Sequence, residues 1–291
     1  MNSYLFDNPF TIPLSDELLN RLVEKIEKLV PENRFKGVHT LVSISGGSCT
    51  GKSSIISKGL TDHLSVPYTL LDQDTFQNNP AYSKNFSQQY RWDHPDNFAI
   101  DTCTEALNRL KNNKEVIVPD YSFKADEPIG HKRLNPNPVI LLEGLYAAYQ
   151  NLGQESDFVI YLESPFYARL IRRIFRNTLE RYKGRDPALI LKGFITSVTK
   201  AHTDFVTTQR TNADVVIKMP FDFSDLIDRF ALKPLRGLPK YDWCVELADD
   251  LTAAITPSGF FTLIYKKEKY LEFEVDSEVQ VLLKKLNWKA Q

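Results

Sequence analysis

The spacing of hydrophobic residues changes near Val38. Before it, apolar residues recur every three or four positions from Leu14 to Val30, and Ser15 is a candidate N-cap, so we expect an amphipathic helix that ends at Pro31. From Val38 onward, short apolar runs rich in β-branched residues alternate with longer stretches of helical spacing. Strands that alternate with helices predict a mostly parallel sheet with helices on both faces.

The expected elements follow this alternation. The expected strands span 38–45, 68–71, 139–142, 158–162 and 215–217. The expected helices span 52–64, 97–111, 165–181 and 187–209. After Pro220 the pattern is less regular, and it predicts a hairpin within 260–275 and a helix from about residue 277 to 286.

A glycine-rich segment, GGSCTGKS at 46–53, follows the first of these strands. It matches G-x-x-x-x-G-K-[ST] at every fixed position, between an expected strand and an expected helix. Such a loop points backbone N–H groups at phosphate oxygens, and the helix N-terminus favours negative charge. We expect Lys52 to reach the β- and γ-phosphates of ATP and Ser53 to bind Mg²⁺. The candidate ATP-binding residues are Gly46, Gly47, Ser48, Cys49, Thr50, Gly51, Lys52, Ser53 and Ser54.

Acidic residues follow two other expected strands. Asp74 comes shortly after the strand at 68–71, and Glu143 ends the apolar run that begins at Val139. Ligands of parallel sheets bind at the carboxyl ends of the strands. An acid there can accept the proton of an attacking hydroxyl or hold a metal ion. An aspartate at a strand end is also a common helix cap or turn residue.

A basic stretch lies between residues 169 and 186. The sequence RLIRRIFR at 169–176 leads through Glu180 and Arg181 to GRD at 184–186. Many arginines in one helical segment form either a solvated face or, near a phosphate loop, a lid that closes over the triphosphate. By themselves the residues leave these two interpretations equal.

Taken in order, these segments resemble the uridine kinase and phosphoribulokinase family of P-loop kinases, most closely its uridine–cytidine kinase branch. The similarity covers about residues 38–220. It rests on GGSCTGKS, QDTF from Gln73, WDHPDNF from Trp92, PDYSF from Pro119, LLEGLY from Leu141, the stretch 169–186 and ADVVI from Ala213.

The resemblance implies a role for single residues. Asp74 matches the general base for a nucleoside 5′-hydroxyl, and Asp93 matches the carboxylate that holds the ribose 2′- and 3′-hydroxyls. Trp92 and Tyr121 would line the base or sugar pocket. Glu143 would be an acid at the metal, together with Ser53 and Asp74. The alternative for Asp93 is a cap on the helix that begins near residue 96 or 97.

The resemblance also assigns the arginines of the basic stretch to a lid. Arg176 and Arg181 would act at the transferring phosphoryl group, and Arg173 and Arg185 would contact substrate. Together with Asp74 and Lys52, the first two would make up the catalytic set.

The chain departs from the family pattern at four places. Gln77 stands where uridine kinases carry an aromatic residue, and either Asp126 or His131 could take the place of a histidine. Two extra residues at 182–183 split the usual E-R-G-R-D run, and Gly193 stands where a glutamine is expected. All four lie in the acceptor or lid region, so phosphoryl transfer is a firmer expectation than the identity of the base.

Composition limits the other function classes. The net charge of −1 gives no support to capture of nucleic acid or of an anionic membrane. Cys49, Cys103 and Cys244 are too widely spaced for a disulfide framework or a CxxC metal site, which favours a reducing compartment. With neither a signal-peptide pattern nor a run of about 18 apolar residues, we expect a cytoplasmic protein without a membrane partner.

We therefore expect an α/β protein with the three-layer fold of P-loop NTPases, a helical lid and a C-terminal appendage. Three contiguous parts are predicted: an N-terminal helical extension in 1–36, a P-loop kinase core in 37–220, and an α+β appendage of unknown role in 221–291. Assembly into a homo-oligomer is left open.

The expected function is ATP- and Mg²⁺-dependent phosphorylation of a nucleoside 5′-hydroxyl, with uridine or cytidine as the acceptor. One alternative is a P-loop kinase for another riboside, a sugar phosphate or pantothenate. Another is a non-catalytic ATP-binding regulatory module. A guanine-specific switch is disfavoured, because the N-K-x-D candidate at 113–116 lacks its final acid.

Overall fold

The computed structural model describes residues 11–77, 93–122, 125 and 127–286. The chain forms two compact units. The first comprises Met1–Ser164 and Ser197–Pro220, and the second comprises Pro165–Thr196 and Phe221–Gln291. Among the described helices, none is long and apolar enough to cross a membrane.

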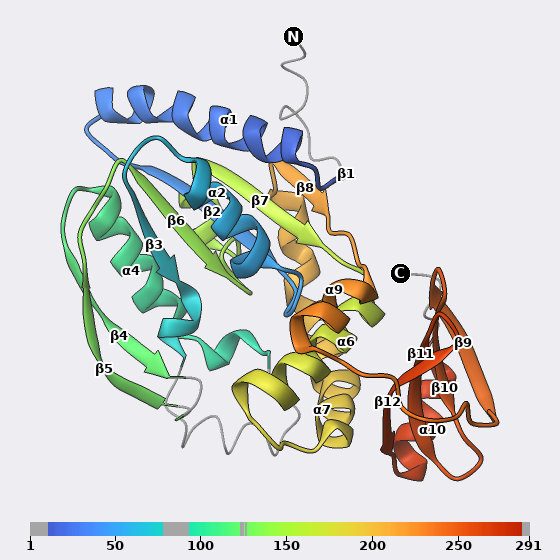
Figure 1. The fold of residues 1–291 in the computed structure, drawn as a ribbon. Helices are drawn as coiled ribbons and strands as arrows, with labels where there is room; N and C mark the ends of the chain where they lie inside the picture. Colours follow the sequence, from blue (N-terminus) through green and yellow to red (C-terminus); the bar gives the residue numbers. More distant parts are fainter. Residues whose placement is uncertain (1–10, 78–92, 123–124, 126, 287–291) are drawn as a thin grey trace. The chain divides into compact units, whose positions relative to one another are not determined.

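A six-stranded sheet forms the centre of the first unit, and all of its strand pairs are parallel (Figure 1). In spatial order the strands are β1 (Thr11–Pro13), β8 (Val215–Lys218), β7 (Phe158–Glu163), β2 (Thr40–Gly46), β6 (Val139–Gly144) and β3 (Tyr68–Asp72). The expected α/β fold with a mostly parallel sheet is confirmed. The edge strand β1 was not predicted, because three residues are too few to show a period.

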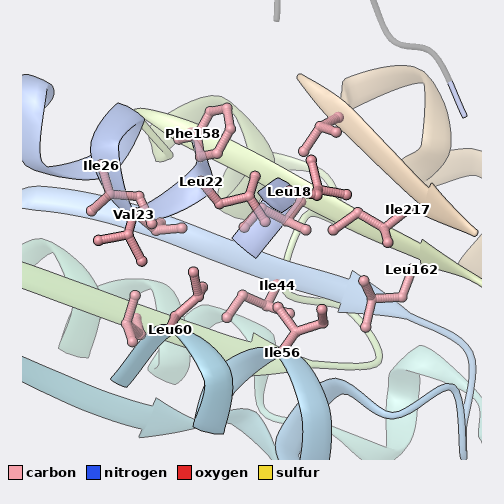
Figure 2. Packing of buried hydrophobic residues seen from close by; sticks show 14 of the residues in the cluster. Leu18, Leu22, Val23, Ile26, Ile44, Ile56, Leu60, Phe158, Leu162 and Ile217 are labelled. Carbon is pink, nitrogen blue, oxygen red and sulfur yellow. The ribbon is translucent and has the colours of Figure 1, made fainter. Parts of the chain in front are cut away.

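Two helices cover one face of this sheet. They are α1 (Asp16–Phe35) and α2 (Lys58–His63), which continues the wide helical turns of Lys52–Ser57. Figure 2 shows Leu22 and Ile26 of α1 packed with Leu60 of α2 over the strands. The side chains at this face alternate along each strand with those of the opposite face, as the pleat of a strand requires.

The opposite face is covered by α4 (Ile100–Lys111), α5 (Asn151–Glu155) and the helical segment 199–212. Leu41, Ile140 and Leu142 point to α4 and α5, whereas their neighbours Val42 and Leu141 point to α1 and α2. This double coverage explains why the strands are continuous apolar runs rather than alternating ones.

The N-terminal helix belongs to this core and is not an extension of it. Leu22 and Ile26 are fully buried in the same cluster as the strands. The helix also runs past Pro31 to Phe35, beyond its expected end. Buried Asn33 donates from Nδ2 to Thr40 Oγ1 at 3.1 Å, which ties this last turn to the start of β2.

A two-stranded antiparallel hairpin lies outside the main sheet. It consists of β4 (Val116–Ser122) and β5 (Glu127–Leu134), with a register shift between Asp120 and Tyr121. The sequence did not predict it. Every residue of β5 is exposed or half-buried, so the strand lacks the buried apolar pattern that reveals a strand.

The second unit combines helices with an antiparallel sheet. Its first segment contains α6 (Phe166–Phe175), the helical turns Arg176–Arg181 and α7 (Pro187–Gly193). Its second segment contains α9 (Phe223–Phe230), the sheet β12-β11-β10-β9 and α10 (Ser277–Lys285). The strands are β9 (Trp243–Ala248), β10 (Leu251–Ile255), β11 (Phe260–Tyr265) and β12 (Glu268–Glu274).

The hairpin expected within 260–275 is present as β11 and β12, and the helix expected after it is α10. The grouping of segments differs from the three contiguous parts expected. One unit boundary falls at Pro220, but residues 165–196 belong with 221–291 rather than with the core. The reason is packing between distant segments, such as Phe175 on Phe223 with ring centroids 6.0 Å apart.

Candidate phosphate loop and acceptor site

The glycine-rich loop joins the end of β2 to the helical turns at 52–57. Gly46 has φ +147°, and a Cβ at this position would lie 2.6 Å from the carbonyl oxygen of Leu162 on β7. Gly51 has φ +102°. Within the turn, Thr50 donates from its N–H and from Oγ1 to the carbonyl of Gly47, at 3.2 and 2.9 Å. Both glycines are therefore required by the shape of the loop.

Lys52 folds back over this loop. Its Nζ donates to the carbonyl oxygens of Gly46 at 2.9 Å and Gly47 at 3.0 Å. Burial lowers the pKa of Lys52, while the charges of Asp74, Glu143, Cys49 and Asp93 oppose that shift. An anionic phosphate would offer this ammonium a stronger, charge-assisted partner than two carbonyl groups. Ser53 and Ser54 expose their side chains at the start of the helical turns.

Two acids expected at strand ends, Asp74 and Glu143, and a third acid, Asp93, oppose the lowering of the Lys52 pKa by burial. Asp74, Glu143 and Asp93 come from segments far apart in the sequence, yet all three act electrostatically on its ammonium group. The register of the parallel strands explains why two of these acids are neighbours. Asp72 at the end of β3 pairs with Glu143 at the end of β6, and Asp74 follows Asp72 by two residues. The fold thus brings the phosphate loop and the candidate acids into one site.

Ser57 holds Glu143 in place. Its Oγ donates to Glu143 Oε2, and both side chains are buried. Ser57 lies one helical turn beyond Ser53, on the inner side of the helix. Ser57 was not predicted as a site residue, since a serine within a helix carries no pattern of its own.

Asp72 fixes the turn that carries Asp74. Its Oδ1 accepts the backbone N–H of Asp74 at 2.9 Å and starts the short helix Gln73–Phe76. Burial and the charge of Asp74 raise the pKa of Asp72 to about 7. The capping role considered for an aspartate at this strand end belongs to Asp72, which leaves Asp74 at the site.

Gln73 is a second residue that the sequence did not identify. It is fully buried, and its Oε1 accepts the backbone N–H of Tyr146 at 2.7 Å. Gly144 leaves room for it, because a Cβ there would lie 2.4 Å from Gln73 Cβ. The glutamine therefore links the turn of Asp74 to the loop after β6.

Gln209 makes a similar connection from the helical segment 199–212. Its Oε1 accepts from Ser45 Oγ at 2.7 Å and from the N–H of Ala148 at 3.0 Å. Its Nε2 donates to the carbonyl of Leu145 at 2.8 Å. This buried amide fixes the strand before the phosphate loop relative to the loop after β6.

Asp93 is buried next to Tyr146, whose hydroxyl donates to the Asp93 carbonyl. Burial, together with the charge of Asp93, raises the pKa of Tyr146. The helical turn Pro95–Asn97 is capped by His94, whose Nδ1 accepts the N–H of Asp96 at 3.2 Å. The residue that caps this turn is thus His94 and not Asp93. Trp92, expected beside it, lies outside the described residues.

The expected pocket residues of the hairpin are placed in part. Tyr121 is half-buried on β4, and this strand packs against the helix Gln73–Phe76 that contains Asp74. His131 is exposed on β5 opposite Pro119, and Asp126 lies outside the described residues. Gln77 forms a bridge with Phe98 after the helix that carries Asp74.

The four expected lid arginines lie in the second unit, while the phosphate loop lies in the first. Arg173 lies over the ring of Phe194 at 5.9 Å, and Arg176 donates from Nε to Asn177 Oδ1 at 3.2 Å. Arg185 lies over the ring of Tyr182 at 4.7 Å, so one of the two inserted residues supports a lid arginine.

Arg181 is the fourth of these arginines and follows Glu180 directly. The carboxylate of Glu180 pairs with Arg229 on α9 at 2.8 Å. The segment expected to form a lid therefore has a polar contact with the segment that follows Pro220.

The donor set fits Mg²⁺ bound with a nucleotide. Within the described ranges, no group of three or more histidine, cysteine, aspartate or glutamate side chains could hold a metal ion alone. Mg²⁺ is commonly held by one or two carboxylates together with substrate phosphates. Ser53, Asp74 and Glu143 supply one hydroxyl and two carboxylates of this kind.

Sequence comparison identifies the family of the chain. The model of the family described as "Phosphoribulokinase / Uridine kinase family" matches residues 41–222. A uridine kinase of Macrococcus caseolyticus is 31% identical over 183 residues, which cover 61% of this chain and 87% of that protein. Uridine kinase-like protein 3 of Arabidopsis thaliana is 28% identical over 220 residues, which cover 73% of this chain and 46% of that protein. The chain thus spans about half the length of the Arabidopsis relatives that it matches.

Solved structures show the same fold at low sequence identity. A D-glycerate 3-kinase from Cryptococcus neoformans aligns with a TM-score of 0.54 at 10% identity, over 69% of this chain and 96% of that one. A phosphoribulokinase from Rhodobacter spheroides aligns with a TM-score of 0.50 at 14% identity, over 62% and 70% of the two chains. At these identities the likeness concerns the fold alone.

Proposed function

The chain belongs to the phosphoribulokinase / uridine kinase family, and on that premise we propose that it transfers the γ-phosphoryl group of ATP to the 5′-hydroxyl of a nucleoside. The observation that carries the proposal is the connection between the phosphate loop and the ends of β3 and β6. Ser57, on the helical turns after the loop, donates to Glu143, and Glu143 pairs with Asp72, which caps the turn of Asp74. The charges of Asp74 and Glu143 favour the ammonium form of Lys52, the cation proposed to bind phosphate.

The phosphate loop would bind the triphosphate. Its backbone amides and Lys52 offset the charge that develops on the transferring group. Ser53, Asp74 and Glu143 would hold Mg²⁺, which when bound neutralises part of the phosphate charge. Arg176 and Arg181 are proposed to close over the nucleotide and exclude water, which would otherwise hydrolyse ATP.

Asp74 would act as the general base. Its carboxylate accepts the proton of the acceptor hydroxyl as the oxygen attacks the γ-phosphorus, and the bond to the bridging oxygen of ADP breaks. The short helix capped by Asp72 sets the backbone position from which the Asp74 side chain extends. Buried Gln73 attaches the same helix to the loop after β6, so the base has little freedom to move.

Asp93 would select the acceptor by accepting hydrogen bonds from the ribose 2′- and 3′-hydroxyls. The uridine kinases among the relatives support a nucleoside, with uridine or cytidine first. Gln77 and Gly193 differ from the pattern of uridine kinases, so the base is best determined by experiment.

The test is a panel of acceptors with ATP and Mg²⁺: uridine, cytidine, adenosine, a sugar phosphate and pantothenate. We expect a nucleoside 5′-monophosphate, detected by phosphorus NMR. Lys52→Ala should abolish transfer, and Asp74→Asn should lower kcat by about 10²–10⁴-fold. Lys58→Ala, an exposed lysine on α2, is the matched control and should retain wild-type turnover.

Three results would count against this function. Wild-type turnover by Lys52→Ala would remove the phosphate loop from the reaction. Turnover on an alcohol other than a nucleoside would reassign the acceptor. ATP binding without transfer to any acceptor would favour a regulatory nucleotide-binding module.

A further inference from the structure

The basic segment at 165–196, here called the lid segment, shares a core with residues 221–291, here called the C-terminal module. Phe175 ends α6 and is buried against two rings of α9. Its centroid lies 6.0 Å from that of Phe223 and 5.8 Å from that of Phe230, with the second pair stacked. The lid arginine Arg176 is the next residue along the chain.

The aromatic contacts continue from α9 into the C-terminal sheet. The ring of Phe223 lies 5.3 Å from that of Tyr265 on β11 and 5.8 Å from that of Tyr270 on β12. A continuous set of packed rings therefore leads from the lid helix through α9 to the β11–β12 hairpin. Because packed interiors are stiff, such a set transmits position between the segments.

Ion pairs fix the lid segment at two further points. Arg229 on α9 donates from Nε and from a terminal nitrogen to Glu180 Oε1 at 3.1 and 2.8 Å, and from that nitrogen to Oε2 at 3.1 Å. Lys192 on α7 pairs with Glu278 at 2.7 Å and with Asp276 at 3.5 Å. Both partners of Lys192 lie at the N-terminus of α10.

The size of the lid segment also indicates that it depends on the C-terminal module for its fold. The lid segment contains about 30 residues, and chains below about 40 residues seldom bury enough apolar surface to fold without further support. The family match ends at residue 222, two residues into the C-terminal module. The module thus supplies, in this chain, a packing surface for the lid that the matched region does not contain.

We propose that the C-terminal module is the structural support on which the lid segment packs, and that Arg229 is a positioning residue for Arg181. Arg229 holds the carboxylate of Glu180 through three hydrogen bonds, and Arg181 is its direct neighbour in the chain. Because Arg229 binds both carboxylate oxygens of Glu180, it restrains the rotation of this helical turn about its axis. The same restraint sets the direction in which the next side chain, that of Arg181, leaves the helix. The assignment of Arg181 to the phosphoryl group rests on the proposed function.

Because the Arg229–Glu180 ion pair is exposed, its effect on the position of the lid can be measured apart from its effect on stability. The side chains of Arg229 and Glu180 are 51% and 39% exposed. Exposed ion pairs contribute little to the stability of a fold. Loss of the pair should therefore leave global unfolding nearly unchanged and act on the lid alone, which a merely structural role would not do.

The experiment compares Arg229→Ala, Arg229→Lys and the exchange Glu180→Arg with Arg229→Glu. Arg236→Ala, an exposed arginine of the same module, is the matched control. We expect Arg229→Ala to lower kcat by about ten- to a hundredfold while the KM for the acceptor stays constant. Hydrolysis of ATP without acceptor should rise relative to transfer. Arg229→Lys and the exchange should each restore part of kcat, and all variants should unfold at temperatures close to that of Arg236→Ala.

A second readout needs no kinase activity. Trypsin should cleave at residues 181–185 faster in Arg229→Ala than in Arg236→Ala, because the helical turn is no longer held. If the wild type phosphorylates no acceptor but cleavage accelerates, the proposed function fails and the anchoring stands. If the wild type is active and Arg229→Ala matches Arg236→Ala in both readouts, the anchoring is wrong.

Discussion

The substitution Gly144→Ala tests whether one close contact sets the position of the candidate base. Gly144 ends β6 against buried Gln73, the residue before Asp74. An added Cβ would lie 2.3 Å from Gln73 Oε1 and 2.4 Å from Gln73 Cβ. The amide could rotate away, but Cβ is attached to the backbone, so the helix Gln73–Phe76 itself has to move.

Two costs add up in this variant. Forcing extra atoms into a packed interior costs about 1–3 kcal/mol. Displacing Gln73 also breaks the hydrogen bond that the N–H of Tyr146 donates at 2.7 Å, and a buried donor without a partner costs about 1–3 kcal/mol. We therefore expect the free energy of unfolding to fall by about 2–6 kcal/mol. At roughly 2–4 °C per kcal/mol the melting temperature should fall by about 5 °C or more.

The functional effect follows from the same movement. A displacement of the base by about 1 Å can cost about 10²-fold in rate, so kcat should fall well beyond the loss of folded protein. Chemical denaturation and kcat at saturating ATP measure the two effects separately. Gly130→Ala is the matched control, because a Cβ there would meet no atom within 4 Å.

A second variant identifies the contact. Gln73→Ala combined with Gly144→Ala keeps the clash, because alanine retains Cβ, so it should not recover the stability of the wild type. Stability of Gly144→Ala equal to that of Gly130→Ala would refute the argument. A loss of stability with unchanged kcat would show that the contact supports the fold without setting the base.

Three further predictions follow from the site. Asp93→Ala should depress kcat/KM for uridine and shrink its advantage over deoxyuridine, since one charge-assisted hydrogen bond to a ribose hydroxyl is worth roughly 1.5–3 kcal/mol; equal use of both nucleosides by the wild type would remove this role. Ser57→Ala takes away the hydroxyl that donates to Glu143, so the Mg²⁺ concentration for half-maximal rate should rise, with Ser57→Thr closer to the wild type; an unchanged Mg²⁺ dependence would contradict it. Asp72 has its pKa raised from 3.8 to about 7 in the folded protein, so its protonated form is favoured there and stability should be lost as the pH rises from about 4 through 7. Without metal or nucleotide, the free energy of unfolding of Asp72→Asn should therefore rise relative to that of the wild type as the pH rises. A difference between the two free energies that does not change with pH would show that Asp72 does not titrate in this way.

Much of the first unit follows from local pattern. The apolar runs at 139–142 and 158–162 become the two parallel strands that flank β2, and they are continuous because strands covered on both faces need no polar alternation. The loop at 46–53 is equally local, since its turn depends on glycines that are visible in the sequence. Asp74 and Glu143 were found because the ends of parallel strands meet at one edge.

Tertiary structure decided which other residues support these groups. Ser57, Gln73 and Gln209 show no periodicity and match no motif, and their importance comes from buried partners far away in the sequence. The short strand β1 and the exposed hairpin β4–β5 were missed for a related reason. Three residues of β1 are too few to show a period, and β5 has no buried residue that could reveal a strand pattern.

The lid segment shows most clearly which properties come from local sequence and which come from the tertiary fold. Its arginines and helical spacing are properties of 165–196 alone, and the sequence determined them. Its membership in the unit of 221–291 depends on Phe175 meeting Phe223 and on Arg229 meeting Glu180, contacts between residues about 50 positions apart. Periodicity records only which side of a helix is apolar, so the surface that covers that side is decided by the fold.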